Sequence, residues 1–224
     1  MAGVVIDVYF IDVNVSRDVI GALAELLTET ERARADRYRF DDDRRRSIVA
    51  RAATRRILSR LTGIAPRELH IVEGEHGKPG LAGGEIELNA SHSGDLVALA
   101  FARVTPVGID VERRRKLHDA LALARRYFSE AELAFVEGAE DIGAAFFIVW
   151  TAKEAIVKAS GKGIGASDLR GFTVPFGAAR LQQVTGTWSV ATLEPPMHGY
   201  HAALAARTGV EPVNQSTVDA SSLL

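Results

Sequence analysis

The sequence predicts an α+β protein built from two similar halves. Several long stretches space their apolar residues as amphipathic helices do, whereas shorter stretches rich in β-branched and apolar residues have the character of strands. A faint internal repeat supports the two halves, because the segment D-L-V-A-L-A-F-A-R in the first resembles Y-H-A-A-L-A-A-R in the second. We therefore expect halves at residues 1–105 and 106–207, which meet near Thr105, and a flexible polar tail over 208–224.

The first half is expected to begin with a strand over residues 4–13, followed by three helices. Ser16 and Thr28 have hydroxyl groups of the kind that cap helix N-termini, so we expect one helix after Ser16 and a short, charged helix after Thr28. A longer helix is expected over 43–61, with an apolar side facing inward and most of its arginines facing outward.

A loop and a pair of strands should complete the first half. Glycine and proline predict the loop over 73–80, in which the following proline holds Lys78 in an extended conformation. We then expect a strand that ends at Asn89, a tight turn over 91–95 and a buried strand over 96–102.

The second half is expected to open with a strand over 107–112. Helical structure should follow over 116–138, with a new helix start at Ser129. A long helix is expected in the stretch from 146 to 163. The last expected strands are 172–174, 188–193 and 200–206.

The long helix between 146 and 163 has an unusual second face. Its first face is an apolar stripe, which consists of Ile148, Ala152, Ala155, Ile156 and Ala159. The opposite face carries two aromatic side chains, Phe147 and Trp150, in line with Glu154 and Lys158. Because a solvated face rarely holds two large aromatics, we expect protein on both sides of the helix, with Trp150 packed and both charges in a costly position. The alternative is an ordinary exposed ion pair one helical turn apart.

Asp110 and Glu112 are two acidic residues on one expected strand. Strand periodicity places them on the same face, while Ile109 and Val111 face the core. Two neighbouring carboxylates repel each other unless they are protonated, separately paired or bridged by a cation. Mg²⁺ fits this arrangement, because it usually takes a few protein carboxylates together with substrate phosphates. The alternative is a solvent-facing strand with alternating acidic residues.

The composition excludes several classes of site. The chain of 224 residues has no cysteine, which excludes disulfides, zinc–thiolate sites and a thiol nucleophile. No apolar run reaches the roughly 18 residues of a membrane span, so we expect a cytoplasmic protein. A net charge of −2 provides no general attraction to nucleic acid or to membranes. The arginine runs at 44–46 and 113–115 are expected either to be solvated or to bind phosphates or an acidic partner protein.

Common short motifs of hydrolases and phosphate-binding loops do not explain the polar residues. Ser91, His92 and Asp95 are disfavoured as a catalytic triad, because adjacent serine and histidine side chains on a strand point in opposite directions. No nucleophile elbow surrounds Ser91. The glycine and lysine at 77–78 are followed by proline, unlike those of a phosphate-binding loop.

Four sequence blocks in a fixed order are more specific than these general features. They are G-K-P at 77–79, N-A-S-H-S-G at 89–94, G-I-D-V-E at 108–112, and W-T-A-K-E-A at 150–155, the last followed by Lys158 and by G-K-G at 161–163. In order and spacing, over about residues 30 to 205, they resemble the 4′-phosphopantetheinyl transferases of the surfactin-synthetase-activating type. No single block is specific, but the ordered set is.

The resemblance implies a fold and a reaction. The fold would be a monomeric pseudo-dimer of two α+β halves, each a small, mainly antiparallel sheet packed with helices, with coenzyme A in the cleft between them. In the reaction, a serine hydroxyl of an apo acyl or peptidyl carrier protein would attack the pantetheine-side phosphorus of coenzyme A and release 3′,5′-ADP. Such an enzyme would serve polyketide or non-ribosomal peptide synthesis, with neither nucleic acid nor membrane as a partner.

The resemblance also implies roles for individual residues. Asp110, Glu112 and Glu154 would hold Mg²⁺ on the diphosphate, and Lys158 would stabilise the transition state. Either Glu154 or a water would accept the serine proton. The implied contacts to coenzyme A are Lys78, Ser91, His92, Lys158, Arg34, Arg37 and Arg46, with Ser47 a further candidate. Lys78 would lie near the adenosine and 3′-phosphate end, and a cationic His92 is one alternative.

Two other functions use the same residues. A non-catalytic module could bind coenzyme A or a nucleotide in the same cleft, although binding alone would not require Glu154. A metal-dependent hydrolase of diphosphates would use the same carboxylates with water as the nucleophile. The arginine runs at 44–46 and 113–115, the second extended by Lys116, are candidate docking sites for an acidic carrier protein.

Overall fold

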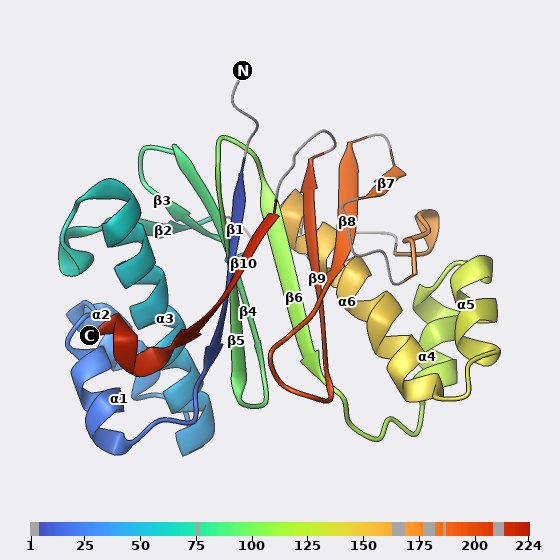
Figure 1. Ribbon diagram of the computed structural model, residues 1–224, viewed down its shortest axis with the longest axis horizontal. Coiled ribbons are helices and arrows are strands. Elements are labelled where there is room, and N and C mark those ends of the chain that lie inside the picture. Colours follow the sequence, from blue (N-terminus) through green and yellow to red (C-terminus); the bar gives the residue numbers. More distant parts are fainter. Residues whose placement is uncertain (1–4, 75–76, 163–168, 177–181, 186, 208–212) are drawn as a thin grey trace.

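The molecule has helices outside and two β-sheets inside (Figure 1). The computed structural model describes residues 5–74, 77–162, 169–176, 182–185, 187–207 and 213–224. The helices α1 (Arg17–Ala24), α2 (Glu29–Ala35) and α3 (Asp41–Thr62) lie against the outer face of one sheet. The helices α4 (Ala120–Tyr127), α5 (Glu130–Glu137) and α6 (Ile142–Ser160) cover the other sheet. The expected α+β class, with a sheet and helices in each half, is confirmed.

The strands of each sheet come mostly from one half of the chain. In the described residues, the first sheet contains, in order, β10 (Val213–Asp219), β1 (Ile6–Asp12), β5 (Leu96–Arg103), β4 (Ile86–Ser93), β3 (Pro79–Leu81) and β2 (Ile71–Glu73). The second contains β6 (Val107–Arg113), β9 (Tyr200–Arg207), β8 (Trp188–Leu193) and β7 (Gln182–Thr185). All of these neighbours pair antiparallel except β1 and β10, which pair in parallel.

Hydroxyl caps begin the helices where the sequence indicated. Ser16 accepts a hydrogen bond from the amide of Val19, and Thr28 forms a capping box with Glu31. Ser129 forms the same box with Glu132 at the start of α5. These reciprocal bonds satisfy amide groups that a helix N-terminus would otherwise leave unpaired.

Three apolar clusters separate the layers. Leu58 of α3 and Leu88 of β4 belong to the cluster between the first helices and the first sheet. Phe10 and Ile109 belong to the cluster between the two sheets, and Ala155 of α6 to the cluster between the second sheet and its helices. Each sheet is therefore buried on both faces, which holds the two halves together through apolar contact as well as through the chain.

The C-terminal end is not a flexible tail over residues 213–224. Residues 208–212 lie outside the described part, but 213–219 form β10 beside β1, and Ala220–Leu223 form the short 3-10 helix η4. The guanidinium group of Arg56 in α3 donates hydrogen bonds to the carbonyls of Leu223 and Leu224. The end of the chain is thus attached to the first half, across the molecule from the strand β9 that precedes it (Figure 1).

Three local expectations were also wrong. The hairpin turn is shorter than expected, because β4 continues to Ser93 and only Gly94 and Asp95 separate it from β5. The expected loop over 73–80 contains the end of β2 and the start of β3. Residues 172–174 form no strand, and the 3-10 helix η3 (Leu169–Gly171) precedes them.

A ladder of side chains joins the two sheets at β4 and β6. The side-chain oxygens of Asn89, Ser91 and Ser93 accept hydrogen bonds from the backbone amides of residues 109, 111 and 113, at 2.9, 3.3 and 3.0 Å. Alternate residues of β4 thereby replace the backbone carbonyls that a neighbouring strand would offer. The ladder fixes the position of β6 along β4.

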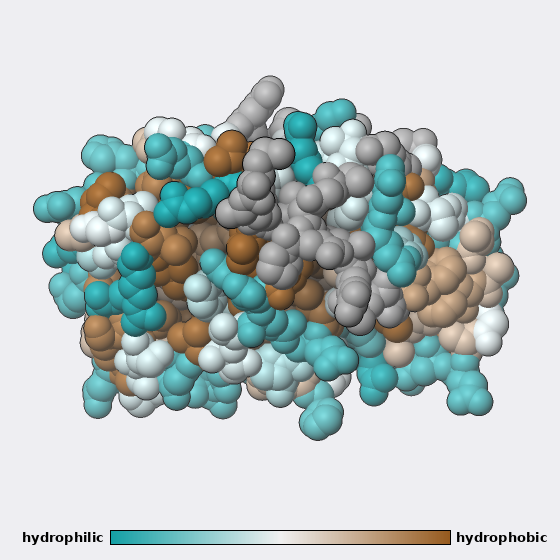
Figure 2. Space-filling model, turned by 45° about the horizontal axis from the view of Figure 1, so that its top comes forward, coloured by the Kyte–Doolittle hydropathy of each residue, from teal (hydrophilic) through white to brown (hydrophobic). Residues whose placement is uncertain are grey.

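The surface is mixed in character. Figure 2 shows hydrophilic side chains along the edges of one face and hydrophobic ones mainly over the N-terminal half. Among the residues described as exposed, the large apolar side chains of that half are Val5, Tyr38, Phe40, Ile64, Val72 and Val104. A search of the described helices found none with the length and apolar character needed to cross a membrane.

Candidate active site

Close packing of α6 on β6 sets the position of the candidate active site. A Cβ atom on Gly108 of β6 would lie 2.1 Å from the carbonyl oxygen of Ala155 and 2.3 Å from the amide nitrogen of Ala159. Only glycine leaves room for the helix backbone there. Because Glu154 and Lys158 lie beside these two alanines, the contact brings both side chains over the strand that carries Asp110.

The helix α6 is covered on both sides, as its sequence indicated. Trp150 packs against Tyr127 and Phe146, and Phe147 is buried. Glu154 is only 5% exposed. The alternative of an exposed ion pair one turn apart on the helix is therefore wrong, and the partner of Lys158 lies on β6 instead.

Lys158, Asp110 and Ser91 form a compact hydrogen-bonded group. The ammonium group of Lys158 donates to Asp110 Oδ1 at 2.7 Å and to Ser91 Oγ at 2.9 Å. Ser91 Oγ in turn donates a hydrogen bond to Asp110 Oδ1 at 2.9 Å. Three residues far apart in the sequence, from β4, β6 and α6, are thus brought to one point.

Two buried carboxylate oxygens in the candidate active site have no hydrogen-bond partner among the described residues. They are Asp110 Oδ2 and Glu154 Oε1. An ionised carboxylate oxygen can only accept, so burial without a donor is costly unless a cation or a proton is bound. These two atoms are therefore suited to a hard cation.

Burial raises the pKa of Glu154 to about 7. The negative charge of Asp110 adds to this rise, the positive charge of Lys158 opposes it, and Glu112 contributes a further small rise. Glu154 therefore gains or loses its proton near neutral pH. A carboxyl group in this range can accept or donate a proton under physiological conditions.

Glu112 lies on the same face of β6, two residues beyond Asp110, as strand periodicity indicated. Its Oε2 accepts hydrogen bonds from Ser93 Oγ at 2.9 Å and from Arg115 at 3.3 Å. In the described part of the chain, no group of three or more His, Asp or Glu side chains is arranged to hold a metal ion by itself. The carboxylates therefore do not form a preformed cage of three ligands.

A cleft of about 580 Å³ lies on the other side of β4. Ala90 and His92 line it, whereas the alternate residues Asn89, Ser91 and Ser93 point towards β6. Partial desolvation, together with the positive charges of Arg46 and Lys158, lowers the pKa of His92. This favours a neutral imidazole at pH 7 over the cationic alternative.

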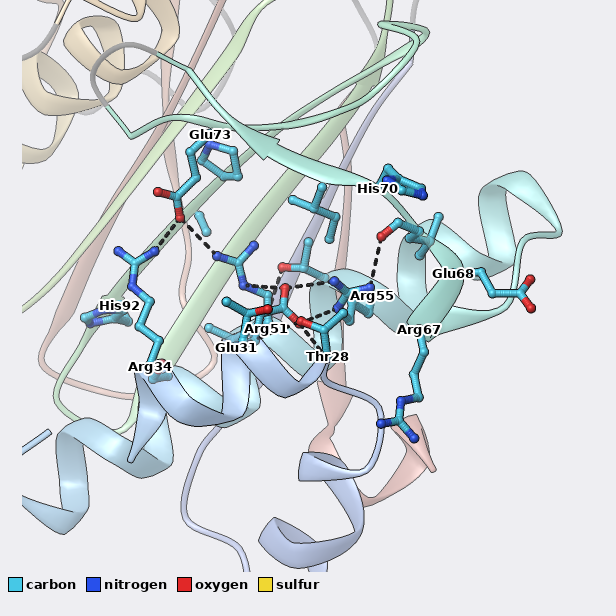
Figure 3. Close-up of a pocket in the computed structure, with 18 of the residues that line it drawn as sticks. Thr28, Glu31, Arg34, Arg51, Arg55, Arg67, Glu68, His70, Glu73 and His92 are labelled. Atoms are coloured by element: carbon cyan, nitrogen blue, oxygen red, sulfur yellow. Dashed lines mark hydrogen bonds and ion pairs between the residues drawn. The ribbon is translucent and has the colours of Figure 1, made fainter. Parts of the chain in front are cut away.

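Two of the arginines implied as coenzyme A contacts lie near this cleft. Arg34 lines it and donates a hydrogen bond to Glu73 of β2 (Figure 3). Arg46 is not among the lining residues. It donates to the carbonyl of Gly94 at 2.9 Å and pairs with Asp43, close enough for its charge to act on His92.

The other implied contacts are less closely grouped. Arg37 is exposed and does not line the cleft, whereas Ser47 does. The ammonium group of Lys78 lies 3.3 Å from Glu87 Oε2 and 3.4 Å from the carbonyl of Ala159. Lys78 therefore lies beside the end of α6, on the side of β4 that carries Ser91.

A buried ion pair that no sequence pattern indicated supports α6. Lys153 Nζ lies 2.8 Å from Glu132 Oε2, and both side chains are fully buried. Lys153 also donates to the carbonyls of Leu169 and Phe172, and Glu132 accepts from the amide of Val174 at 2.8 Å. The capping-box spacing after Ser129 could have drawn attention to Glu132, but no local signal pairs it with Lys153.

The raised pKa of Glu154 leads to a pH-dependent stability. Between pH 4.5 and about 7, the folded protein keeps a proton on Glu154 that the unfolded chain, with a pKa of 4.5, releases. The free energy of unfolding therefore falls as the pH rises through this range. Above about pH 7, the destabilisation by Glu154 is constant. Glu154→Gln should therefore raise the free energy of unfolding at pH 8, in a chelating buffer, by about 2 kcal/mol. The gain should shrink as the pH falls towards 5.

Urea denaturation at pH 5, 6, 7 and 8 measures this effect. Glu25→Gln is the control, since that side chain is 70% exposed and its replacement should change stability little at any pH. A gain from Glu154→Gln that is the same at every pH would contradict a buried carboxyl group with a raised pKa.

Two family models match this chain, one in each half. A family model described as the 4′-phosphopantetheinyl transferase superfamily matches residues 106–205. A second, described as the N-terminal part of 4′-phosphopantetheinyl transferase, matches residues 14–103. The two matches together cover the strands β2 to β8, most of β9 and every residue of the hydrogen-bonded group, but not β1 or β10.

Individual relatives are similar over most of the chain. The 4′-phosphopantetheinyl transferase HetI of Nostoc is 33% identical over 197 residues, which cover 85% of this chain and 83% of the relative. The 4′-phosphopantetheinyl transferase psf-1 of Bacillus pumilus is 37% identical over 66% of this chain and 64% of its own length. The transferase Sfp of Bacillus subtilis is 25% identical over 69% of each chain.

Proposed function

We propose, because this chain belongs to the 4′-phosphopantetheinyl transferase superfamily, that it transfers the 4′-phosphopantetheine group of coenzyme A to a serine of an apo acyl or peptidyl carrier protein. The observation that carries the proposal is the group formed by Asp110, Lys158 and Glu154, in which a lysine, a paired carboxylate and a carboxyl with a pKa of about 7 meet. A protein that only bound coenzyme A would have no need of such a carboxyl group.

The site residues fit a divalent metal such as Mg²⁺. Asp110 Oδ2 and Glu154 Oε1 are buried acceptors without a donor among the described residues, and Glu112 would complete the set. Mg²⁺ is commonly held by one or two carboxylates together with substrate phosphates, so a preformed three-ligand cage is not required. When bound, Mg²⁺ would neutralise charge on the diphosphate of coenzyme A.

The protein's own side chains account for the remaining steps. Lys158, held by Asp110 and Ser91, directs its ammonium group into the space where the diphosphate would bind and stabilises the charge that develops there. Glu154 in its ionised form accepts the proton of the carrier serine, either directly or through a water. The serine oxygen then bonds to the pantetheine-side phosphorus, and the bond from that phosphorus to the bridging oxygen breaks, so that 3′,5′-ADP leaves with the electron pair.

The finer assignment follows the sequence resemblance. We propose that the protein is of the surfactin-synthetase-activating type, that it works as a monomer in the cytoplasm, and that it serves polyketide or non-ribosomal peptide synthases. The 25% identity to Sfp supports the subtype, and the site itself favours no particular carrier protein.

Intact-mass measurement of a carrier protein tests the proposed function. An apo peptidyl carrier protein incubated with this protein, coenzyme A and Mg²⁺ should gain one phosphopantetheinyl unit. Glu154→Gln should slow the gain at least about 100-fold, because it removes the proton acceptor and a metal ligand. Glu25→Gln, on the exposed surface, should react at the wild-type rate.

Two results would contradict the proposal. Failure to modify several different carrier proteins, with normal binding of coenzyme A, would favour a binding module. Release of 3′,5′-ADP without any carrier protein would favour a hydrolase of diphosphates.

Basic residues at the end of β6 and just after it form a candidate docking site for an acidic carrier protein. Arg113 and Arg114 are 59% and 47% exposed, and Arg114 lines a hollow between the end of β6 and the start of α6. Arg115 contacts Glu112 and the ring of Phe147, so its replacement would disturb the active site as well.

Reversing the first two charges tests the docking site. Arg113→Glu with Arg114→Glu should raise the KM for the carrier protein about 5-fold or more, with a steeper dependence on salt, and leave the KM for coenzyme A unchanged. The control is Arg125→Glu, since Arg125 is 61% exposed and also paired, but lies on α4. Equal changes in both KM values, or in neither, would rule out docking at this surface.

A further inference from the structure

Glu73 forms ion pairs with two arginines that line the cleft beside β4. Arg34 of α2 donates a hydrogen bond to Glu73 Oε1, and Nη2 of Arg51, on α3, lies 3.6 Å from the same oxygen. Figure 3 shows Glu73 reaching down from β2 so that both guanidinium groups point at its carboxylate. The carboxylate of Glu73 thus pairs with two arginines that an anionic ligand could bind, and it shares the second, Arg51, with Glu31, whose Oε1 lies 3.4 Å from Arg51 Nε.

Glu31 is a second acidic residue that lines the cleft, and it has a structural role. Arg55 Nε and Nη2 donate to its two oxygens at 2.6 and 2.9 Å, and the amide of Thr28 completes the capping box at 3.0 Å. Burial alone would raise the pKa of Glu31, but the hydrogen bonds from Arg55 and Thr28 and the charges of Arg55 and Arg51 lower it. Glu31 is therefore bound firmly in its ionised form.

Glu73 is held much less firmly than Glu31. Its side chain is 43% exposed, against 16% for Glu31, and it projects from β2, a three-residue strand at the edge of the sheet. Arg34, its closest partner, is 61% exposed. Exposed ion pairs of this kind contribute little to stability, so a ligand can replace Glu73 at low cost.

We propose that Glu73 competes with the phosphate monoester of coenzyme A for Arg34 and Arg51, and thereby limits the affinity for the phosphorylated nucleotide. The inference rests on the proposed function, which brings a ligand with a diphosphate and a separate monoester. The diphosphate is assigned to Lys158 and the carboxylates, so the monoester is the anion left for the cleft. His92 lies between the cleft and the candidate active site, because it lines the cleft and is close enough to Lys158 for that positive charge to lower the pKa of His92.

A different role for Glu73 would have the opposite effect. If its carboxylate served mainly to hold Arg34 and Arg51 in a binding geometry, its removal would weaken ligand binding. If the carboxylate of Glu73 competes, its removal frees Arg34, leaves Arg51 paired with Glu31 alone at 3.4 Å, and removes a like charge close to the phosphate. The sign of the change in affinity therefore distinguishes the two roles.

Calorimetric titration of coenzyme A and of dephospho-coenzyme A into the full chain with Mg²⁺ tests the inference. The two ligands differ only in the phosphate monoester. Glu73→Gln should lower the Kd for coenzyme A roughly 3- to 10-fold, the effect of one partly screened charge at a few ångströms. The Kd for dephospho-coenzyme A should change less than about 2-fold.

Glu68→Gln is the matched control. Glu68 also lines the cleft, forms no ion pair to a described residue, and points away from the two arginines in Figure 3. Its replacement should change either Kd by less than about 2-fold.

The inference is overturned if Glu73→Gln binds coenzyme A no more tightly than wild type, or if it tightens both ligands equally. Tightening by Glu68→Gln to the same extent would also overturn it, because a general change in charge would then suffice. Binding is measured without a carrier protein, so an absence of group transfer would count against the proposed function and not against this inference.

Discussion

The register of β6 along β4 is the constraint on which the candidate site depends. In the described residues, β6 is an edge strand of its sheet, and the amides of residues 109 and 111 would be buried donors without acceptors if Asn89 and Ser91 did not reach them. A shift of β6 by one residue would turn its acidic side chains into the apolar layer between the sheets. The ladder therefore decides where the carboxylates lie.

The same ladder leaves one carboxyl group without a cationic partner of its own. Ser91 takes part in the ladder and also holds Lys158 and Asp110 together, so the only lysine of the group is already paired with Asp110. Glu154, on α6, is buried and lies near the negative charge of Asp110, and both effects raise its pKa. The positive charge of Lys158 lowers the pKa only in part. An arrangement with one acidic group in excess is a disadvantage in the free protein and an advantage when a divalent cation is bound.

Much of this could be predicted from local sequence patterns. Helical periodicity and two aromatic residues indicated that α6 is covered on both sides, and strand periodicity placed Asp110 and Glu112 on one face. The ordered sequence blocks brought Ser91 and Lys158 into one site before any geometry was known. The two periodicities depend only on residues near one another in the sequence, whereas the site was indicated by the order of short blocks along the chain.

The errors come from interactions between distant residues. The serines of β4 have the propensity of a turn, but their pairing with β5 and their hydrogen bonds to β6 keep them in a strand. The strand expected at 172–174 is absent because Lys153 and Glu132 bind the backbone groups that a neighbouring strand would use. The strand β10 is polar and largely exposed, so nothing local indicated that it pairs with β1, some 200 residues earlier in the chain.

The position of a bound cation shows directly whether Asp110 and Glu154 hold a metal ion beside the diphosphate. Crystals grown with coenzyme A and Mn²⁺, measured at the manganese absorption edge, would locate the metal by its anomalous signal. The account predicts a manganese ion bound by Asp110 and Glu154 and by the diphosphate of coenzyme A, with Lys158 in contact with that diphosphate. A manganese ion bound away from both carboxylates, or a diphosphate far from Lys158, would contradict it.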